Sequence, residues 1–266
     1  MTAERTWRIF LGSFILLIVS YLIYFIRYPM WQFFSNIEPI FALMFLSYFI
    51  VFLVATILLK KDSKKSLSIV FKNNSNFMIL AGLFFALIYL GVFYLISFGL
   101  GSSIELGSFP NLQGYENYSV YSIPSVLVLY LLFSLFGAFS EEVAYRGYVQ
   151  TRISAKYGAA IGIVVSTLFF SLQHIHVFQI NWISQFLQNR LIHVVFFGIF
   201  TGYLFYKSKE NIWSVVAFHV LLNTFSVVVP IIISHSFWFT FYVAEIISFV
   251  VITLTLNYLP QKNKSF

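Results

Sequence analysis

The stretch FMILAGLFFALIYLGVFYLISFGL, residues 77–100, decides the fold class, because it holds no charged residue over 24 positions. At roughly 1.5 Å of rise per residue, a helix of this length is long enough to cross a hydrocarbon core of about 30 Å. No water in that core can bind an unpaired backbone amide, so a chain in lipid forms helices or a closed barrel. Barrel strands alternate apolar and polar residues. An unbroken apolar run therefore predicts a transmembrane helix.

The composition extends this prediction to the whole chain. Of 266 residues, 60% are hydrophobic and only 9% are charged, whereas soluble domains typically carry about 25% charged residues. Comparable runs predict about eight spans, at residues 9–26, 40–59, 77–100, 124–145, 158–176, 188–206, 211–233 and 237–257. We therefore predict an all-α, polytopic membrane bundle that forms a single domain, residues 1–266, and retains its N-terminal run as the first helix.

The distribution of positive charge predicts the topology. If the N-terminus lies inside, the inner segments hold 14 of the 16 Lys and Arg residues, and the outer segments hold only Arg27 and Arg190. Cytoplasmic loops are enriched in Lys and Arg, so both termini are predicted to be cytoplasmic. The net charge of +7 then reflects loops that face anionic lipid, and we expect no nucleic-acid partner. Without an organelle signal, a bacterial plasma membrane is the expected location.

Polar residues within three of the predicted spans are the candidate functional residues, because ionisable groups inside a membrane are costly and usually functional. They are Glu141, Glu142, Arg146, His174, His219 and Asn223. Glu142 and Arg146 are four residues apart in the favourable acid-first order, which predicts an ion pair that leaves Glu141 another partner. His219 and Asn223 are also four residues apart, so both side chains point the same way.

The spacing between spans brings these residues to one depth. Glu142 lies 16 residues before Gly158, and His174 lies 16 residues after it. If the chain turns at Gly158 and both helices are straight, with the second continuing past His176, these two side chains are level. At roughly 1.5 Å per residue, His219 reaches the same cytoplasmic half of the membrane.

A carboxylate, two imidazoles and an amide at one level form a hydrolytic set of groups. A buried glutamate can act as a general base toward water. Neutral histidines can hold a metal ion or position that water, and an asparagine amide can stabilise the oxyanion of a tetrahedral intermediate.

Three motifs occur in order on these apolar segments: EExxxR at 141–146, FxxxH at 170–174 and HxxxN at 219–223. In this respect the chain resembles the CPBP family of intramembrane proteases, which includes the CAAX-type prenyl endopeptidases and bacterial bacteriocin self-immunity proteins. The resemblance covers roughly residues 124–230, the expected catalytic core. It implies hydrolysis, within the membrane, of a peptide bond in a membrane-anchored protein or peptide.

The resemblance also implies a role for each candidate residue. Glu141 would be the base, and His174 would share or position the water. His219 and Asn223 would serve the oxyanion or a metal, with Glu142 and Arg146 in support. If a metal is present, zinc is the expected ion, and its ligands would be Glu141, His174 and His219. The sequence leaves open whether the enzyme is a metalloprotease or a metal-free glutamate protease.

Two other functions remain as alternatives. One is a non-catalytic membrane protein of the same family, such as an immunity protein or a regulatory scaffold. The other is a transporter or proton relay, against which the chain shows no duplicated halves. Other intramembrane protease chemistries are not expected, because the chain has no cysteine, no HExxH motif and only one aspartate, Asp62. The segment GLGS, residues 99–102, lacks the GxSG order of a serine site.

The remaining polar residues are expected to be structural. Glu245 lies in the middle of the last span, where we expect it to be protonated or hydrogen-bonded to a neighbouring helix, with a place beside the cavity as the alternative. His176 and His193 are expected at the membrane interface, and His235 is expected in a loop. The aromatic run VVFFGIF, residues 194–200, is predicted to face lipid or to pack against other helices.

Overall fold

Each of the eight predicted spans coincides with a helix in the computed structural model, which describes residues 7, 10–22, 37–62, 75–101, 103–104, 123–175, 191–228, 231–232 and 237–258. The helices are Phe10–Leu22, α2 (Ile37–Asp62), α3 (Ser75–Gly99), α4 (Ile123–Glu142), α6 (Ala159–Gln173), α8 (Leu191–Lys207), α9 (Ile212–Val228) and α10 (Phe237–Tyr258). A short antiparallel pair, β1 (Ser103–Ile104) with β2 (Ile231–Ile232), is the sole sheet within these ranges. The predicted all-α class is confirmed.

Two helices meet the requirements for crossing a membrane by length and composition alone. They are Ala42–Lys60 within α2 and Asn76–Gly99 within α3. Large apolar side chains on α3 are exposed, including Phe77 at 67% and Leu95 at 74%, as expected of side chains that contact lipid. These features support a membrane location, whereas the number of spans and the single domain remain predictions.

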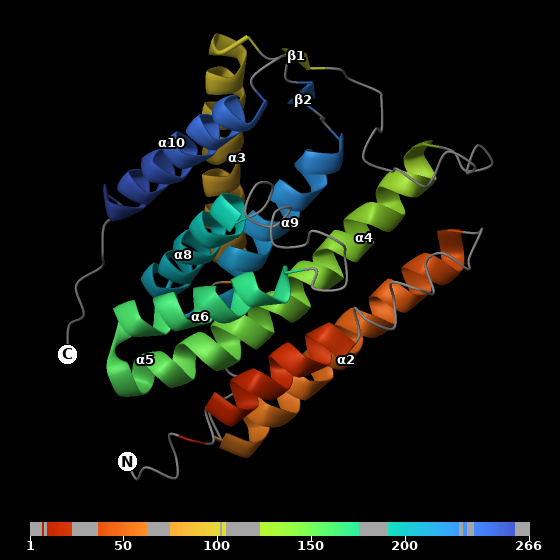
Figure 1. Cartoon of the computed structure of the whole chain (residues 1–266), viewed down its shortest axis with the longest axis vertical. Coiled ribbons are helices and arrows are strands. Elements are labelled where there is room, and N and C mark those ends of the chain that lie inside the picture. Colours follow the sequence, from red (N-terminus) through yellow and green to blue (C-terminus); the bar gives the residue numbers. More distant parts are fainter. Residues whose placement is uncertain are drawn as a thin grey trace.

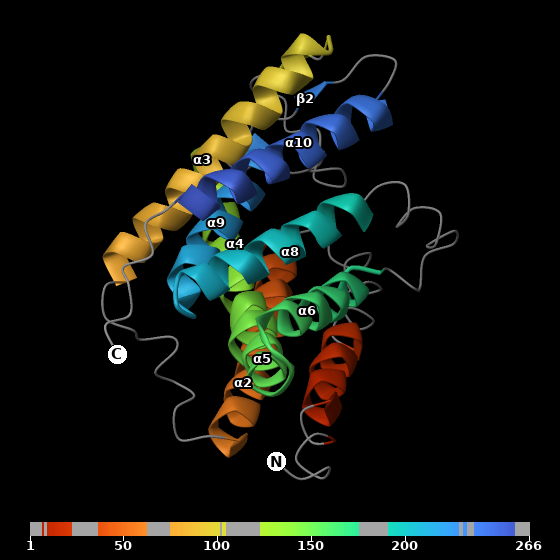
Figure 2. The same ribbon diagram turned by 90° about the vertical axis from the view of Figure 1, so that its left-hand side faces the viewer.

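The helices pack around α9 and the end of α4 (Figure 1). Helix α4 lies alongside α2 and contacts α9, while α3 packs against both α9 and α10. Helix α8 lies between α6 and α10 and contacts both, as the turned view shows (Figure 2). This arrangement brings α4, α6 and α9 together, as the depths of their polar residues predicted.

The predicted turn at Gly158 is confirmed. Helix α5 (Thr151–Tyr157) ends there and α6 begins at the next residue. Gly158 has φ 90° and ψ 160°, a conformation that residues with a side chain rarely adopt.

The helix before this turn is not straight, contrary to the prediction. Between α4 and α5, residues Val143–Gln150 form a π-helix whose side chains are all buried. Neighbouring hydroxyl groups bind two of its carbonyl groups: Ser166 Oγ donates to Tyr145 O at 3.0 Å, and Thr151 Oγ1 donates to Arg146 O at 3.0 Å. Because hydrogen bonds from residue i to i+5 put more residues into each turn, the segment rises less per residue than an α-helix.

Helix α6 ends at Gln173, whereas the sequence analysis expected it to continue past His176, which lies outside the described residues. His174 Nδ1 donates to Phe170 O at 2.8 Å, and the His174 backbone N–H binds Ser171 O at 3.0 Å. The imidazole thus binds Phe170 O, which is the carbonyl oxygen that the His174 backbone N–H would bind if the α-helix continued. Basic side chains commonly cap the last carbonyl groups of a helix in this way.

Candidate active site

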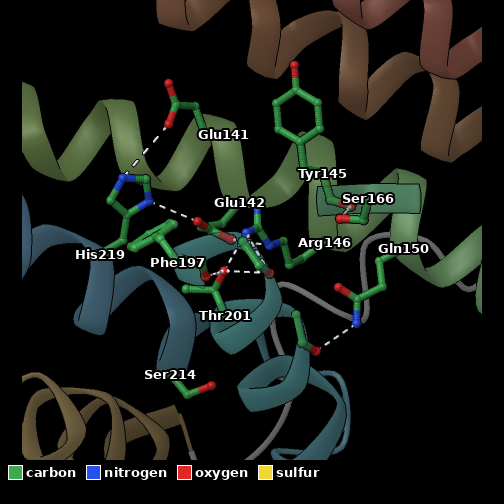
Figure 3. Close-up of polar contacts among 12 residues, drawn as sticks. Glu141, Glu142, Tyr145, Arg146, Gln150, Ser166, Phe197, Thr201, Ser214 and His219 are labelled. Atoms are coloured by element: carbon green, nitrogen blue, oxygen red, sulfur yellow. Dashed lines mark hydrogen bonds and ion pairs between the residues drawn. The ribbon is translucent and has the colours of Figure 1, made fainter. Parts of the chain in front are cut away.

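The centre of the candidate site is a histidine held between two consecutive glutamates (Figure 3). His219, on α9, places Nδ1 2.8 Å from Glu142 Oε1. Because a carboxylate only accepts hydrogen bonds, Nδ1 carries the proton, and in the neutral ring Nε2 is the acceptor nitrogen. Nε2 lies 3.9 Å from Glu141 Oε2, and all three side chains are buried.

The distance between Glu141 Oε2 and His219 Nε2 is too long for a direct hydrogen bond but suits a bridging water. One water molecule can reach both atoms at about 2.8 Å. Both atoms are acceptors when Glu141 is ionised and His219 is neutral, so such a water would donate both of its protons. Its oxygen lone pairs would then point away from the two side chains.

The predicted ion pair between Glu142 and Arg146 is confirmed, with Arg146 Nε 3.1 Å from Glu142 Oε2. The contact lacks hydrogen-bond geometry. Arg146 Nη2 instead donates to Thr201 Oγ1 and, at 3.4 Å, to Gly198 O. Its guanidinium carbon also lies 4.5 Å from the centre of the Phe170 ring. A buried charge costs several kcal/mol unless it is paired, and these contacts supply the pairing.

The burial of Arg146 corrects the sequence analysis, which counted this residue among the positive charges of a cytoplasmic segment. Its side chain is 0% exposed, because the π-helix that carries it is enclosed by α2, α6, α8 and α9. Arg146 is therefore part of the interior of the site.

Glu141 has a partner that the sequence analysis did not name: Gln173 Nε2 donates to Glu141 Oε1 at 2.8 Å. If both helices were straight, Glu142 would lie at the same depth as His174. The hydrogen bond in the structure instead joins Glu141 and Gln173, each of which is one residue earlier in the chain. The shorter rise of the π-helix brings Glu141 closer to the turn at Gly158 than a continuous α-helix would. The structure thus shows a contact between Glu141 and Gln173, and the equal depth of Glu142 and His174 stays a prediction.

His174 and Asn223 lie at the edge of this cluster. The His174 ring centre is 4.6 Å from that of Phe170, and the Phe170 ring centre is 6.3 Å from that of His219. Phe170 thus contacts both imidazoles. Asn223 is half-buried and follows His219 by one turn of α9.

The sequence analysis named Glu141, His174 and His219 as the ligands of a metal ion, if one is present. Such a site requires these three side chains to converge. In the described part of the chain, no three histidine or acidic side chains are arranged to hold a metal ion. The residues as they lie do not fit a metal ion, so we derive no chemical step through one.

Helix α8 contributes residues that the sequence analysis treated as lipid-facing or packing surface. Phe197 places its ring centre 4.6 Å from that of His219, and Gly198 and Thr201 bind Arg146. The packing alternative is correct for Phe197, which is buried. Two features of the sequence could have indicated these contacts. Thr201 is a polar residue within an apolar helix, and Gln173 directly precedes a candidate histidine.

Another buried carboxylate, Glu245, lies on α10, apart from Glu141 and Glu142. Tyr89 OH donates to Glu245 Oε1 at 2.5 Å, and His193 Nδ1 binds the same oxygen at 2.5 Å. The predicted hydrogen bond to a neighbouring helix is confirmed. His193 was expected at the membrane interface; its side chain is 41% exposed, yet it binds inward because α8 packs on α10.

Comparison with known protein families confirms the resemblance drawn from the three motifs. Residues 123–225 match the family described as type II CAAX prenyl endopeptidase Rce1-like. This segment covers less than half of the chain and includes Glu141, Glu142, Arg146, His174, His219 and Asn223. No curated protein matches the sequence.

Proposed function

We propose, on the premise that residues 123–225 form an Rce1-like segment, that this protein is an intramembrane endopeptidase. Its substrate would be a membrane-anchored protein or peptide, hydrolysed by water that a glutamate activates. The observation that carries this proposal is the placement of Glu141 Oε2 3.9 Å from His219 Nε2 while Glu142 holds the other nitrogen of the same ring.

Glu141 would act as the general base. Water bound between Glu141 and His219 attacks the carbonyl carbon of the substrate and transfers a proton to Glu141. The tetrahedral intermediate then collapses as Glu141 passes this proton to the leaving amine. General acid–base transfer of this kind typically contributes a factor of about 10² to 10⁴ in rate.

Glu142 and Arg146 would support this step without contacting the substrate. The bond from His219 Nδ1 to Glu142 keeps Nε2 directed toward the water, as an orienting carboxylate does for the histidine of a serine protease. Arg146 in turn places a positive charge beside the buried Glu142 carboxylate. Loss of either residue would release the ring from its working orientation.

Asn223 and His174 would act on the substrate side. The Asn223 amide is a donor of the kind that stabilises an oxyanion, and it lies one turn from His219 on α9. His174 uses Nδ1 to cap Phe170 O, so in the neutral ring Nε2 is an acceptor for a proton of water or substrate. We place the enzyme in a bacterial plasma membrane, with several spans and with lipid around its apolar helices.

The test compares the wild type with Glu141→Gln in liposomes, with and without a chelator. Each protein is incubated with a pool of membrane-anchored peptides, and new termini are identified by mass spectrometry. The matched control is Glu245→Gln, the same change at a buried glutamate on α10. We expect cleavage by the wild type and the control and none by Glu141→Gln. Equal cleavage by all three proteins would overturn the role of Glu141 and favour a different base.

A further inference from the structure

We infer that Gln173 is a positioning residue for Glu141, and that the N-terminal helix Phe10–Leu22 holds Gln173 in place. This inference rests on the proposed role of Glu141 as the base. It concerns a helix outside residues 123–225, the segment that matches the family.

The contact between Gln173 and Glu141 fixes which carboxylate oxygen is available. Gln173 Nε2 donates to Glu141 Oε1 at 2.8 Å, and this bond leaves Oε2 directed at His219 Nε2, 3.9 Å away. The amide cannot be reversed, because its oxygen would then face a carboxylate that only accepts hydrogen bonds. Without this donor the terminal torsion of Glu141 has a broad range, and Oε2 would spend less time facing His219.

The N-terminal helix binds the end of α6 at two consecutive residues. Ser20 Oγ donates to Leu16 O at 2.9 Å and also lies 3.4 Å from Gln173 Oε1, so the two oxygens share its single proton. The Tyr21 hydroxyl donates to Leu172 O. Leu172 O also accepts from the Ile175 backbone N–H at 3.1 Å, so Tyr21 adds a second hydrogen bond to a carbonyl group in the last turn of α6. The two contacts together hold the backbone and the side-chain amide of Gln173.

Two further contacts show that this helix is docked on both sides of the site. Phe14 packs edge-on against Phe169 of α6, with ring centres 5.3 Å apart. Gly12 faces Tyr148 of the π-helix so closely that a Cβ atom there would lie 2.0 Å from the tyrosine hydroxyl. The close approach therefore requires glycine. The helix contacts both elements whose relative position sets the distance from Glu141 to Gln173.

The test uses two substitutions that separate hydrogen bonding from packing. Gln173→Met keeps the length of the side chain but removes the donor, and we expect kcat to fall about tenfold with KM within about twofold. Gln173→Glu keeps the shape but puts a second carboxylate beside Glu141. Two adjacent carboxylates share a proton, so we expect a larger loss, on the order of a hundredfold. If Gln173 acted only through packing, Gln173→Met would lose more activity than Gln173→Glu, which keeps the shape of the side chain.

The matched control is Gln150→Met. Gln150 is also buried, and its Nε2 donates at 2.8 Å to Gly202 O, away from Glu141. We expect this variant to lower the melting temperature while kcat per folded molecule stays within about threefold. Gln173 is only half-buried, so its variants should keep the melting temperature of the wild type.

Ser20→Ala tests the role of the N-terminal helix. If Ser20 acts through Gln173, Ser20→Ala lowers kcat in the wild type but adds nothing in the Gln173→Met background. Additive losses would overturn that part of the inference. Unchanged kcat in both Gln173 variants, with Glu141→Gln inactive, would overturn the whole inference and leave the proposed function standing. Full activity of Glu141→Gln would remove the proposed function and this inference together.

Discussion

Among the described residues, buried glutamates lie beside histidines in two clusters, and the two clusters are built differently. Glu142 is held by Arg146 and His219 within the segment that matches the protease family. Glu245 is held by Tyr89 and His193, outside that segment. Arginine stays protonated in proteins, whereas tyrosine and histidine are neutral over much of the pH range. The first cluster therefore pairs its carboxylate with a permanent cation, whereas the second holds its carboxylate with donors that carry no permanent charge.

One face of α8 joins the two clusters. His193, Phe197 and Thr201 are spaced four residues apart, and they contact Glu245, His219 and Arg146 respectively. The Phe197 ring centre is 6.0 Å from that of His193 and 4.6 Å from that of His219. A single aromatic layer thus separates a cluster that we assign to chemistry from one that we assign to helix packing. Corresponding substitutions made in each of the two clusters test this assignment.

The largest expected effect is that of Arg146→Met on stability. This change leaves Glu142 buried without its cation, and breaking a buried ion pair in this way typically costs about 3–5 kcal/mol. Chemical unfolding in mixed micelles measures the loss. The double variant Glu142→Gln/Arg146→Met removes both charges and should recover part of the stability. Wild-type stability of the single variant would contradict the ion-pair account.

Glu142→Gln and Glu245→Gln should differ sharply in activity. Loss of a carboxylate that orients a working histidine typically costs about 10–100-fold, so we expect kcat/KM of Glu142→Gln to fall by at least about tenfold. Glu245→Gln should stay within about threefold, because Glu245 has no contact with His219. Peptide cleavage at equal amounts of folded protein measures both. Similar losses in the two variants would show that the clusters act as one.

Thr201→Val should have an intermediate effect on stability. It removes the hydroxyl that accepts from Arg146 and donates to Phe197 O at 2.6 Å. A hydrogen bond to a charged group contributes about 1.5–3 kcal/mol, and Thr201→Ser should restore most of it. The control is Thr255→Val, because Thr255 donates to Val251 O within its own helix at 2.8 Å. Equal losses at the two threonines would contradict a specific role for Thr201.

Tyr89→Phe should have the smallest effect. It removes one donor to Glu245 Oε1, while His193 keeps the other. A typical hydrogen bond contributes about 0.5–1.5 kcal/mol to stability, and cleavage should be unaffected. Unfolding and cleavage assays on the same preparation measure both. A loss of activity greater than that of Thr201→Val would place the Glu245 cluster within the catalytic machinery.

Local spacing was sufficient to predict several of these features. The turn at Gly158, the pairing of Glu142 with Arg146 and the meeting of α4, α6 and α9 follow from periodicity, polar positions and glycine. The hydrogen bond of Glu245 to a neighbouring helix follows from the cost of an unpaired charge in lipid. None of these predictions needed to identify a partner far away in the sequence.

The features that the sequence analysis missed depend on tertiary contacts. The π-helix Val143–Gln150 gives no signal in the sequence, because its apolar and polar residues also suit an α-helix. The roles of Thr201 and Gln173 follow from the altered alignment that this segment imposes, and Tyr89 lies 156 residues from Glu245. Hydroxyl and amide side chains in apolar helices often bind only their own backbone, so their type alone does not reveal a distant partner.

The π-helix Val143–Gln150 also sets the helical phase between the acidic pair and the turn at Gly158. An α-helix rotates roughly 100° per residue. Deleting one residue from this segment would leave α5 and α6 packed as a hairpin but would rotate Glu141 and Glu142 by about that angle. Their carboxylates would then turn away from Gln173 and His219. An ordinary apolar span can accommodate a change of one residue by shifting in the lipid. In this segment the same change would separate the base, Glu141, from His219.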